Sequence, residues 1–250
     1  MESEQRLEGG NASGDVVKVG NTVRKPWTAS TPSVHGYMRF LLESGIDTPA
    51  VMGRDDDGRQ VLEYLPGRLA LDIGRLSHDQ LSRVGELVRS IHDASASFTP
   101  PLSSVWSTAI SAPGDELVCH NDLAPWNLII GERWAFIDWD ASAPSTRLWD
   151  LAYSAQTFTL NDPLCDPSEA AADLVAFING YDADPALRSA LPTVMHRRAA
   201  AMLDLLGSSH ANGVEPWATM YESGHGTHWH AVRDYVGRNH GLWRDTLREA

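Results

Sequence analysis

The stretch that decides the fold is LVCHNDLAPWNLII, residues 117–130. An apolar run leads into this stretch and another leaves it. Between them lie His120, then Asp122 two residues later, then Asn127 after five more. Eleven residues beyond Asn127, the sequence AFIDWD carries a second acid, Asp138, at the end of an apolar run. The pattern predicts a loop, a hairpin and a strand that delivers Asp138 to the same place.

This arrangement of residue types suits the transfer of a phosphoryl group. Such transfer needs a carboxylate that orients the attacking hydroxyl and oxygen ligands that hold Mg²⁺ against the phosphates. Mg²⁺ prefers carboxylate and amide oxygens to sulfur or imidazole. We therefore expect Asp122 to face the acceptor hydroxyl, and Asn127 and Asp138 to bind the metal. The order matches the kinase loop H-R-D-x-x-x-x-N followed by the Asp of D-F-G.

On these residues the chain resembles the aminoglycoside phosphotransferase family of small-molecule kinases. The family pattern reads H-x-D-x-x-x-x-N, then I-D-W-[DE], then D-L-A, and the chain contains all three. The resemblance implies an α+β, bilobal protein-kinase-like fold, with a small antiparallel-sheet N-terminal lobe and a larger, mainly helical C-terminal lobe. It also implies that Asp122 is the catalytic acid/base, that His120 braces the loop, and that Asp150 anchors it by hydrogen bonds. Asp140 is a further candidate near the metal.

Two departures from protein kinases favour a small molecule as the acceptor. Many protein kinases carry a Lys two residues after the catalytic Asp, where this chain has Ala124. In addition, no A-P-E segment follows Asp138.

Composition describes an ordinary soluble globular chain. Its 250 residues can form one large domain or two small lobes. The absence of an apolar run of ~18 residues argues against a transmembrane helix, and the polar, acidic residues 1–15 argue against a signal peptide. Two cysteines, Cys119 and Cys165, provide no disulfide framework, so we expect a cytoplasmic location.

The formal net charge of −13 argues against nucleic acid or an anionic membrane as a partner. The charge is uneven, because residues 1–70 carry −2 and residues 71–250 carry −11. An acidic cleft would attract a cationic small molecule. The alternative, that the acidic surface serves only solubility, stays open.

Residues 7–26 predict a small antiparallel sheet. Val16 to Val19 and Thr22 to Lys25 read as strands around the turn pair Gly20-Asn21. A glycine-containing turn that includes Ser13 precedes them. We expect its backbone N–H groups to cover the phosphates of a bound nucleotide.

A kinase also needs a cation on the third strand to hold the α- and β-phosphates. Arg24 is the first candidate and Lys25 the second. They point to opposite faces of a strand, so at most one should enter the cleft. The helix predicted over residues 33–42 should offer a Glu to this cation, but the nearest residue is His35. The partner of the cation therefore stays open.

Two further strands, at residues 49–53 and 60–65, precede the predicted boundary between the lobes. Glu63 to Gly67 resembles the link between lobes in the family, where the backbone reads the adenine edge. Glu63 and Leu65 are therefore expected nucleotide contacts. We place the boundary at Pro66-Gly67, with an N-terminal nucleotide-binding lobe at residues 1–66 and a C-terminal catalytic and substrate-binding lobe at residues 67–250.

The remainder of the chain reads as helical. Ser77 and Gln80 form a capping-box signature for a helix that ends near His92, which we expect to be a packed structural histidine. Later candidates cover residues 170–178, 185–206 with an interruption at Pro192, 217–222 and 228–247. They should build the acceptor side of the cleft. The H-x-x-H-x-H sequence at residues 225–230 lacks convincing metal-ligand spacing and is interpreted as structural.

These observations predict an Mg²⁺-dependent enzyme that moves the γ-phosphate of ATP or GTP to a hydroxyl of a small molecule. An aminoglycoside-type antibiotic is one expected acceptor. A kinase of a sugar or amino-alcohol metabolite would use the same loop. A nucleotide-binding or immunity-type protein without turnover is the third possibility. The missing helix Glu favours it, whereas the intact Asp122, Asn127 and Asp138 oppose it.

Overall fold

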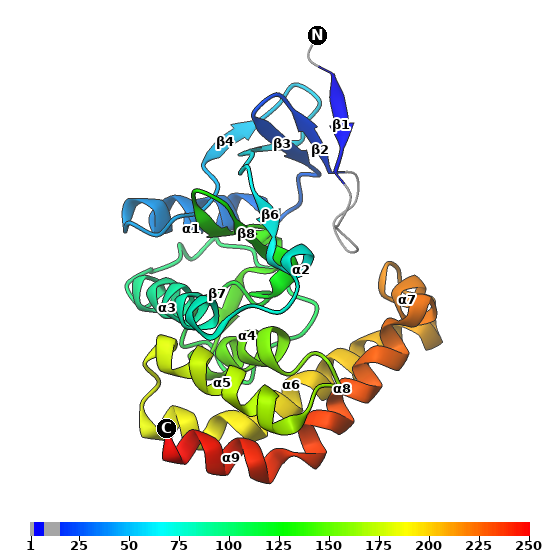
Figure 1. Ribbon diagram of the computed structural model, residues 1–250. Helices are drawn as coiled ribbons and strands as arrows, with labels where there is room; N and C mark the ends of the chain where they lie inside the picture. The colour runs from blue at the N-terminus through cyan, green and yellow to red at the C-terminus, as the bar shows by residue number, and fades with distance from the viewer. Residues whose placement is uncertain (1–2, 8–15) are drawn as a thin grey trace.

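The computed structural model describes residues 3–7 and 16–250 and has a small sheet above a larger, mainly helical part (Figure 1). The predicted α+β, bilobal kinase-like fold is confirmed. Ser13, the expected phosphate-covering residue, lies outside the described residues. Among the described residues, no helix is long and apolar enough to cross a bilayer.

The upper part is a five-stranded antiparallel sheet in the order β1-β2-β3-β5-β4. The predicted hairpin around Gly20 is confirmed: Gly20 has a φ of 56°, a left-handed conformation that glycine adopts without strain. The second predicted strand pair, β4 and β5, is also present. The strands are β1 (Glu4–Arg6), β2 (Val17–Val19), β3 (Thr22–Lys25), β4 (Val51–Arg54) and β5 (Gln60–Glu63).

Helix α1 (Thr31–Glu43) lies between this sheet and the helical part (Figure 1). Its buried face includes Val34, Met38 and Leu41, the apolar positions that predicted it. Tyr37 lies on the same face, and its hydroxyl donates to the Val118 carbonyl at 3.0 Å. This bond ties α1 to the strand that precedes residues 120–127, which we call the catalytic loop for the role that the sequence predicts.

Two small sheets hold the loop region of the lower part. β7 (Leu117–Cys119) pairs with β10 (Ala143–Ser145), and β8 (Leu128–Ile130) pairs with both β6 (Arg68–Leu69) and β9 (Trp134–Phe136). The chain crosses from β5 to β6 through Gly67. A Cβ there would lie 2.6 Å from Ile129 Cγ2 and 2.9 Å from the Ile130 carbonyl oxygen, so a larger residue would push these strands apart. The lobe boundary at Pro66-Gly67 remains a prediction.

The helices of the lower part pack in layers below these strands (Figure 1). Both bonds of the predicted capping box are present at Ser77 and Gln80. Short 3₁₀ turns cover Pro125–Asn127 and Trp139–Ala141, and a π-helical turn covers Tyr221–His225. The helices are α2 (Ala70–Ile73), α3 (His78–Ser95), α4 (Arg147–Thr159), α5 (Pro167–Tyr181), α6 (Pro185–Asn212), α7 (Trp217–Met220), α8 (Gly226–Arg238) and α9 (His240–Glu249).

Two helix predictions were wrong in detail. Helix α6 continues through Pro192, where an interruption was expected. A proline removes one backbone donor, and the buried side chains of Leu191 and Met195 hold the helix on both sides of it. The single helix expected over residues 228–247 is instead two helices that meet at Asn239.

The main hydrophobic core lies directly beneath the catalytic loop. Leu123 in the loop, Phe136 and Trp139 after it, and Leu151 in α4 are all buried within this one cluster. The loop therefore rests on well-packed side chains, which fixes its position in the fold.

Candidate active site

The catalytic loop turns at Asn121, which has a left-handed backbone conformation with a φ of 65°. Its backbone N–H donates to Asp150 Oδ1 at 2.9 Å. Its side-chain amide donates to the carbonyl oxygens of Ala141 and Ala143 at 3.2 and 3.3 Å. Asn tolerates this conformation better than most residues, and these bonds hold the turn in place.

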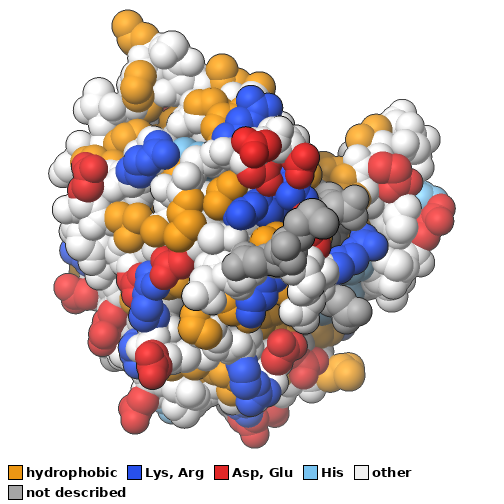
Figure 2. Space-filling view, turned by 90° about the horizontal axis from the view of Figure 1, so that it is seen from above, with side chains coloured by type: hydrophobic (Ala, Val, Ile, Leu, Met, Phe, Trp, Pro, Cys, Tyr) orange, Lys and Arg blue, Asp and Glu red, His pale blue; other side chains and the backbone are white. Residues whose placement is uncertain are grey.

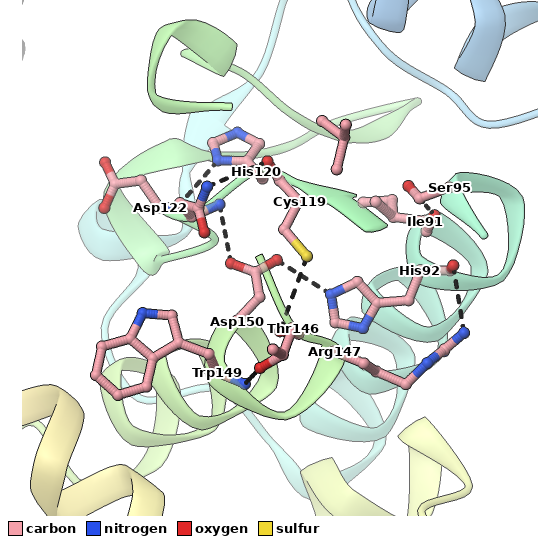
Figure 3. A network of polar contacts seen from close by, with 12 residues as sticks. Ile91, His92, Ser95, Cys119, His120, Asp122, Thr146, Arg147, Trp149 and Asp150 are labelled. Carbon is pink, nitrogen blue, oxygen red and sulfur yellow. Dashed lines mark hydrogen bonds and ion pairs between the residues drawn. The ribbon is translucent and has the colours of Figure 1, made fainter. Parts of the chain in front are cut away.

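A buried network below the loop continues from Asp150 (Figure 3). His92 Nε2 lies 3.0 Å from Asp150 Oδ2, and His92 Nδ1 lies 2.9 Å from the Tyr181 hydroxyl. Cys119 lies beside this pair, and burial raises the pKa of its thiol, which keeps it protonated. His92 is completely buried, as expected of a packed structural histidine. The network joins α3, α4 and α5 under the catalytic loop.

His120 is also completely buried and links the loop to the end of β9. His120 Nε2 donates to the Ile137 carbonyl at 3.0 Å, and Nδ1 accepts the backbone N–H of Asp122 at 3.2 Å. Burial lowers the pKa of this imidazole, which is therefore neutral with its proton on Nε2. Both ring nitrogens are occupied, so the geometry suits a brace and not a proton carrier.

Asp122 points away from Asp150, with its carboxylate free of the buried network (Figure 3). The Asn127 side-chain amide donates to Asp122 Oδ2 at 2.7 Å and to the Asp122 carbonyl oxygen at 2.9 Å. Burial, followed by the nearby charge of Asp138, raises the pKa of Asp122 to about 7. Its carboxylate is held in one orientation and has a proton affinity near neutrality, which suits proton transfer.

Asp138 follows β9 in a left-handed conformation, with φ 61° and ψ 56°. Lys25 forms ion pairs with both Asp138 and Asp140, the second at 2.6 Å. Burial alone would lower the pKa of Lys25, but these two carboxylates more than offset it, and the pKa is raised. A charged lysine thus lies beside two acids that the sequence assigned to the metal region.

The structure brings Lys25 into this cluster and directs Arg24 elsewhere. Arg24 Nη1 donates to Thr22 Oγ1 at 2.5 Å, and its Nε lies 3.4 Å from Asp55 Oδ2. The expectation that the two neighbours point to opposite faces of the strand holds. Lys25, the second candidate, lines the cleft and Arg24, the first candidate, does not. Which of the two holds the nucleotide phosphates stays a prediction.

A buried hydrogen-bond chain stands where the missing helix Glu would be. His35 of α1 donates from Nε2 to Gln60 Oε1 at 3.0 Å. Gln60 Nε2 in turn donates to Asp140 Oδ1 at 3.2 Å. Burial lowers the pKa of His35, so helix α1 offers a neutral group at this position. Lys25 therefore takes both carboxylate partners from the segment after β9. Sequence reasoning missed Gln60, for which no local pattern gives a signal.

A cleft of about 320 Å³ runs between the two lobes next to this cluster. Its polar end carries Lys25, Asn127 and Asp138, and its walls are mainly apolar. Arg24 does not line it. The apolar lining comes from both lobes and includes Val23, Leu62, Leu65, Ile129 and Ile137. A flat apolar group with a charged tail would match this distribution.

Glu63 and Leu65 both line the cleft, and the Glu63 carboxylate is also held by neighbouring groups. Glu63 Oε1 pairs with Arg133 Nη1 at 2.5 Å, and Oε2 accepts the Ala50 N–H at 3.0 Å. Arg133 also pairs with Asp47, and hydrogen bonds to both acids raise its pKa. Arg133, on the turn between β8 and β9, thus connects the lower part to Asp47 and Glu63 near the link between the lobes.

The donor set at the polar end of the cleft fits a magnesium ion. Both hydrogens of the Asn127 amide are used by Asp122, which leaves the amide oxygen as the atom available to a metal. Asp138 and Asp140 add carboxylate oxygens nearby. Such hard oxygen donors are those that Mg²⁺ prefers.

Comparison with known families confirms the resemblance. Residues 103–191 match the model of the phosphotransferase enzyme family, and this range contains the catalytic loop, Asp138 and Asp150. A trifolitoxin immunity protein from Rhizobium leguminosarum bv. trifolii is 31% identical over 177 residues. That similarity covers 66% of this chain and 65% of the relative, slightly less than two thirds of its length.

Several solved structures with the same fold are named as kinases of small molecules. A microcompartment-associated aminopropanol kinase superposes with a TM-score of 0.66 at 16% identity, over 100% of this chain and 95% of its own. An amicoumacin kinase in complex with AMP-PNP and Ca²⁺ gives 0.69 at 12% identity, over 92% and 88%. A choline/ethanolamine kinase family protein from Mesorhizobium loti gives 0.65 at 17% identity, over 99% and 93%. At these identities the likeness establishes the fold.

Proposed function

We propose that the protein is a phosphotransferase that moves the γ-phosphate of ATP or GTP to a hydroxyl of a small molecule. The observation that carries this proposal is that Lys25, Asn127 and Asp138 line one interlobe cleft, with the Asp122 carboxylate hydrogen-bonded to Asn127. A chain that no longer transferred phosphate would have no need of all four groups in these orientations. The match to the phosphotransferase family over the same residues supports it.

Asp122 is the residue that accepts or orients the proton of the acceptor hydroxyl. Its backbone is fixed through His120, and its carboxylate through Asn127. Its raised pKa of about 7 means that it can take up a proton near neutral pH. His120 acts as a brace because both of its ring nitrogens are committed.

Lys25 is the cation that holds the nucleotide phosphates. It is buried at the polar end of the cleft, and burial strengthens its attraction for an anion. The nucleotide must compete with Asp138 and Asp140 for this ammonium group. The base of the nucleotide would lie among the apolar residues near Leu65, with the linker backbone beside it.

Asn127 and Asp138 would hold Mg²⁺, and Asp140 is positioned to assist. When bound, the metal would supply positive charge to the phosphate oxygens and orient the transferred group. The three side chains offer oxygens alone, so the site discriminates against metals that favour sulfur or imidazole.

A small acceptor, rather than a nucleic acid or a membrane, is supported by charge. The chain carries a net charge of −13. On the upper face, the acidic and basic side chains of the described residues are interspersed and form no broad basic surface (Figure 2). Two of the solved structures with this fold are named as kinases of aminopropanol and of amicoumacin. Aminopropanol carries an amine by its name, which is compatible with a cationic acceptor. An amino alcohol and an aminoglycoside-type antibiotic are both candidates.

A second candidate function is immunity to a toxic compound. It is favoured by the name of the relative at 31% identity, an immunity protein. Immunity could arise through phosphorylation of the toxin, or through nucleotide-dependent binding without turnover. The two forms differ in one respect: only the first produces a phosphorylated compound.

A mass-spectrometric transfer assay tests the proposal. The purified chain, Mg²⁺ and ATP or GTP are mixed with a panel of aminoglycosides, other hydroxylated antibiotics, amino alcohols and sugars. We expect a product heavier by about 80 Da, the mass of a phosphoryl group in the proposed transfer. Nucleotide binding without product from any compound would move the assignment to the non-catalytic form of the immunity function.

A further inference from the structure

Arg198 of α6 is a buried cation that lies against the catalytic loop. Its side chain is 95% shielded from solvent, since the residue is 5% exposed. Its Nη2 donates to the carbonyl oxygen of Asn121 at 3.3 Å. Asn121 is the residue at which the loop turns, directly before Asp122. Helix α6 therefore reaches the loop through this one guanidinium group.

The same guanidinium packs on the aromatic face of Tyr153 in α4. The guanidinium carbon lies 4.1 Å from the ring centroid of Tyr153 and 5.6 Å from that of Trp149. Tyr153 is itself buried, and its side chain lies close enough to the Asp122 carboxylate to interact with it. Trp229 of α8 stacks on Tyr153 with an interplanar angle of 12°, which fixes its ring. A continuous set of contacts thus runs from Arg198 through Tyr153 to the Asp122 carboxylate.

The environment of Arg198 is unfavourable for stability. In the described part of the chain, this guanidinium forms no ion pair, although Asp122 and Asp150 act on it as nearby charges, and its Nη1 is buried without a hydrogen-bond partner. Burial removes water from the guanidinium and lowers the pKa of Arg198. A buried cation without an ion-pair partner destabilises a fold, and apolar replacements for buried charges are often neutral or stabilising. Stability therefore does not explain the presence of an arginine here.

We propose that Arg198 and Tyr153 are positioning residues for the phosphotransfer reaction, in which Arg198 holds the Asn121 carbonyl and the Tyr153 ring while Tyr153 orients the Asp122 carboxylate. The inference rests on the proposed function for its catalytic consequence. It does not require Arg198 to touch a ligand, because the unpartnered Nη1 is closed off from solvent.

Two conservative changes test the two contacts, each with a matched control. Arg198→Met removes the guanidinium and keeps an apolar side chain of similar length. Arg197→Met, at the exposed neighbouring position on α6, is its control. Tyr153→Phe removes only the hydroxyl that contacts Asp122. Its control is Tyr235→Phe in α8, which removes a hydroxyl that donates to the Cys165 carbonyl.

The expected result is a loss of rate without a loss of stability or nucleotide affinity. A misplaced catalytic group can reduce the rate by ~10²-fold, which we expect in kcat for Arg198→Met. Tyr153→Phe should lower kcat by ~10-fold, since the hydroxyl beside the Asp122 carboxylate is lost. Nucleotide Kd and the melting temperature should stay close to those of the controls. Arg198→Lys should not restore kcat, because an ammonium lacks the planar fork that stacks and bonds together.

Amide hydrogen exchange over residues 118–128 provides a readout that needs no acceptor. Arg198→Met should speed exchange in this segment relative to Arg197→Met, because the loop loses its bond from α6. Unchanged exchange would overturn the inference. So would an unchanged kcat, or a fall in melting temperature with a parallel loss of nucleotide binding, which would indicate a general structural role.

The same design separates this inference from the proposed function. A wild-type chain that transfers phosphate to no acceptor contradicts the proposed function, and exchange over residues 118–128 then decides the placement of the loop. A wild-type chain that transfers phosphate, with the Arg198 and Tyr153 variants equally active, contradicts the inference alone.

Discussion

Replacement of Lys25 or Arg24 by Met decides which residue is the phosphate-binding cation. The two neighbours differ in their surroundings. Lys25 is buried and paired with Asp138 and Asp140, whereas Arg24 lies beside Thr22 and Asp55 on the other face of the strand. Methionine keeps most of the length of either side chain and removes the charge. Lys25→Met should therefore affect both the stability and the nucleotide affinity, and Arg24→Met should affect neither strongly.

The stability effect follows from the acids left behind. Removing one partner of a buried ion pair costs about 3–5 kcal/mol. The Asp138 and Asp140 side chains are 27% and 36% exposed, so water screens them in part. We expect about 1–3 kcal/mol for Lys25→Met, or a melting temperature lower by about 3–9 °C. Arg24→Met should lose about 1 kcal/mol or less.

The affinity effect follows from the lost phosphate contact. A hydrogen bond to a charged group contributes about 1.5–3 kcal/mol. We therefore expect the Kd for Mg²⁺-ATP to be about 10–150-fold higher in Lys25→Met than in the wild type. Isothermal titration calorimetry measures this Kd, and differential scanning calorimetry measures the melting temperature. Mg²⁺ alone should raise the melting temperature of Lys25→Met more than that of the wild type, because it supplies charge to the two acids. The reasoning is refuted if Arg24→Met weakens nucleotide binding more than Lys25→Met.

Three further predictions concern Asp122 in the catalytic loop, Asp150 below it, and the ion pair between Glu63 and Arg133. The pKa of Asp122 is about 7 in the folded chain and 3.8 ordinarily. Protonation of this carboxyl therefore stabilises the folded chain at low pH, and this contribution is lost as the pH rises through about 7. Asp122→Asn should therefore raise the free energy of unfolding more at pH 8 than at pH 5, by on the order of 1–3 kcal/mol. An equal increase at both pH values would contradict the raised pKa. Asp150→Ala should lower the free energy of unfolding in urea by about 3 kcal/mol, because His92 and the Asn121 backbone N–H lose their buried acceptor. A loss below about 1 kcal/mol would show that the fold does not depend on this network. Glu63→Gln should lower stability by about 0.5–1 kcal/mol through its half-exposed pair with Arg133. Its nucleotide Kd should not change, and a large change would place the Glu63 side chain at the nucleotide.

The sequence was most informative where the determinants are local. The spacing of His120, Asp122 and Asn127, followed by Asp138, predicted the loop and hairpin that the structure contains. Turn glycines and the capping box at Ser77 predicted hairpin and helix positions for the same reason. Each of these patterns depends on neighbours within a few residues.

The sequence was less informative where the determinants come from distant segments. Alternation along β3 required Arg24 and Lys25 to face opposite sides of the sheet. Which of the two side chains points into the cleft depends on how the strand pairs and packs with distant segments. The chain from His35 through Gln60 to Asp140 joins three segments far apart in sequence. No periodicity could indicate that Gln60 stands between a helix and the metal region.

The same limit applies to the second layer of the site. Arg198 lies 76 residues after Asp122 in the sequence and meets the loop through tertiary packing of α6 alone. Charge and periodicity would place an arginine in a helix on its exposed face. The break at Asn239 and the continuous helix through Pro192 similarly reflect packing that local propensity does not contain.

The central claim is that Asp122 carries out proton transfer in phosphotransfer, and the kinetics of Asp122→Ala test it most directly. The measurement compares kcat for the best acceptor, with Mg²⁺-nucleotide saturating, in wild type and variant, together with the nucleotide Kd of each. The account predicts that kcat falls by ~10²–10⁴-fold while the nucleotide Kd stays nearly constant, the usual effect of losing a general acid/base. A variant with the wild-type kcat would contradict the account, because Asp122 would then have no part in the reaction.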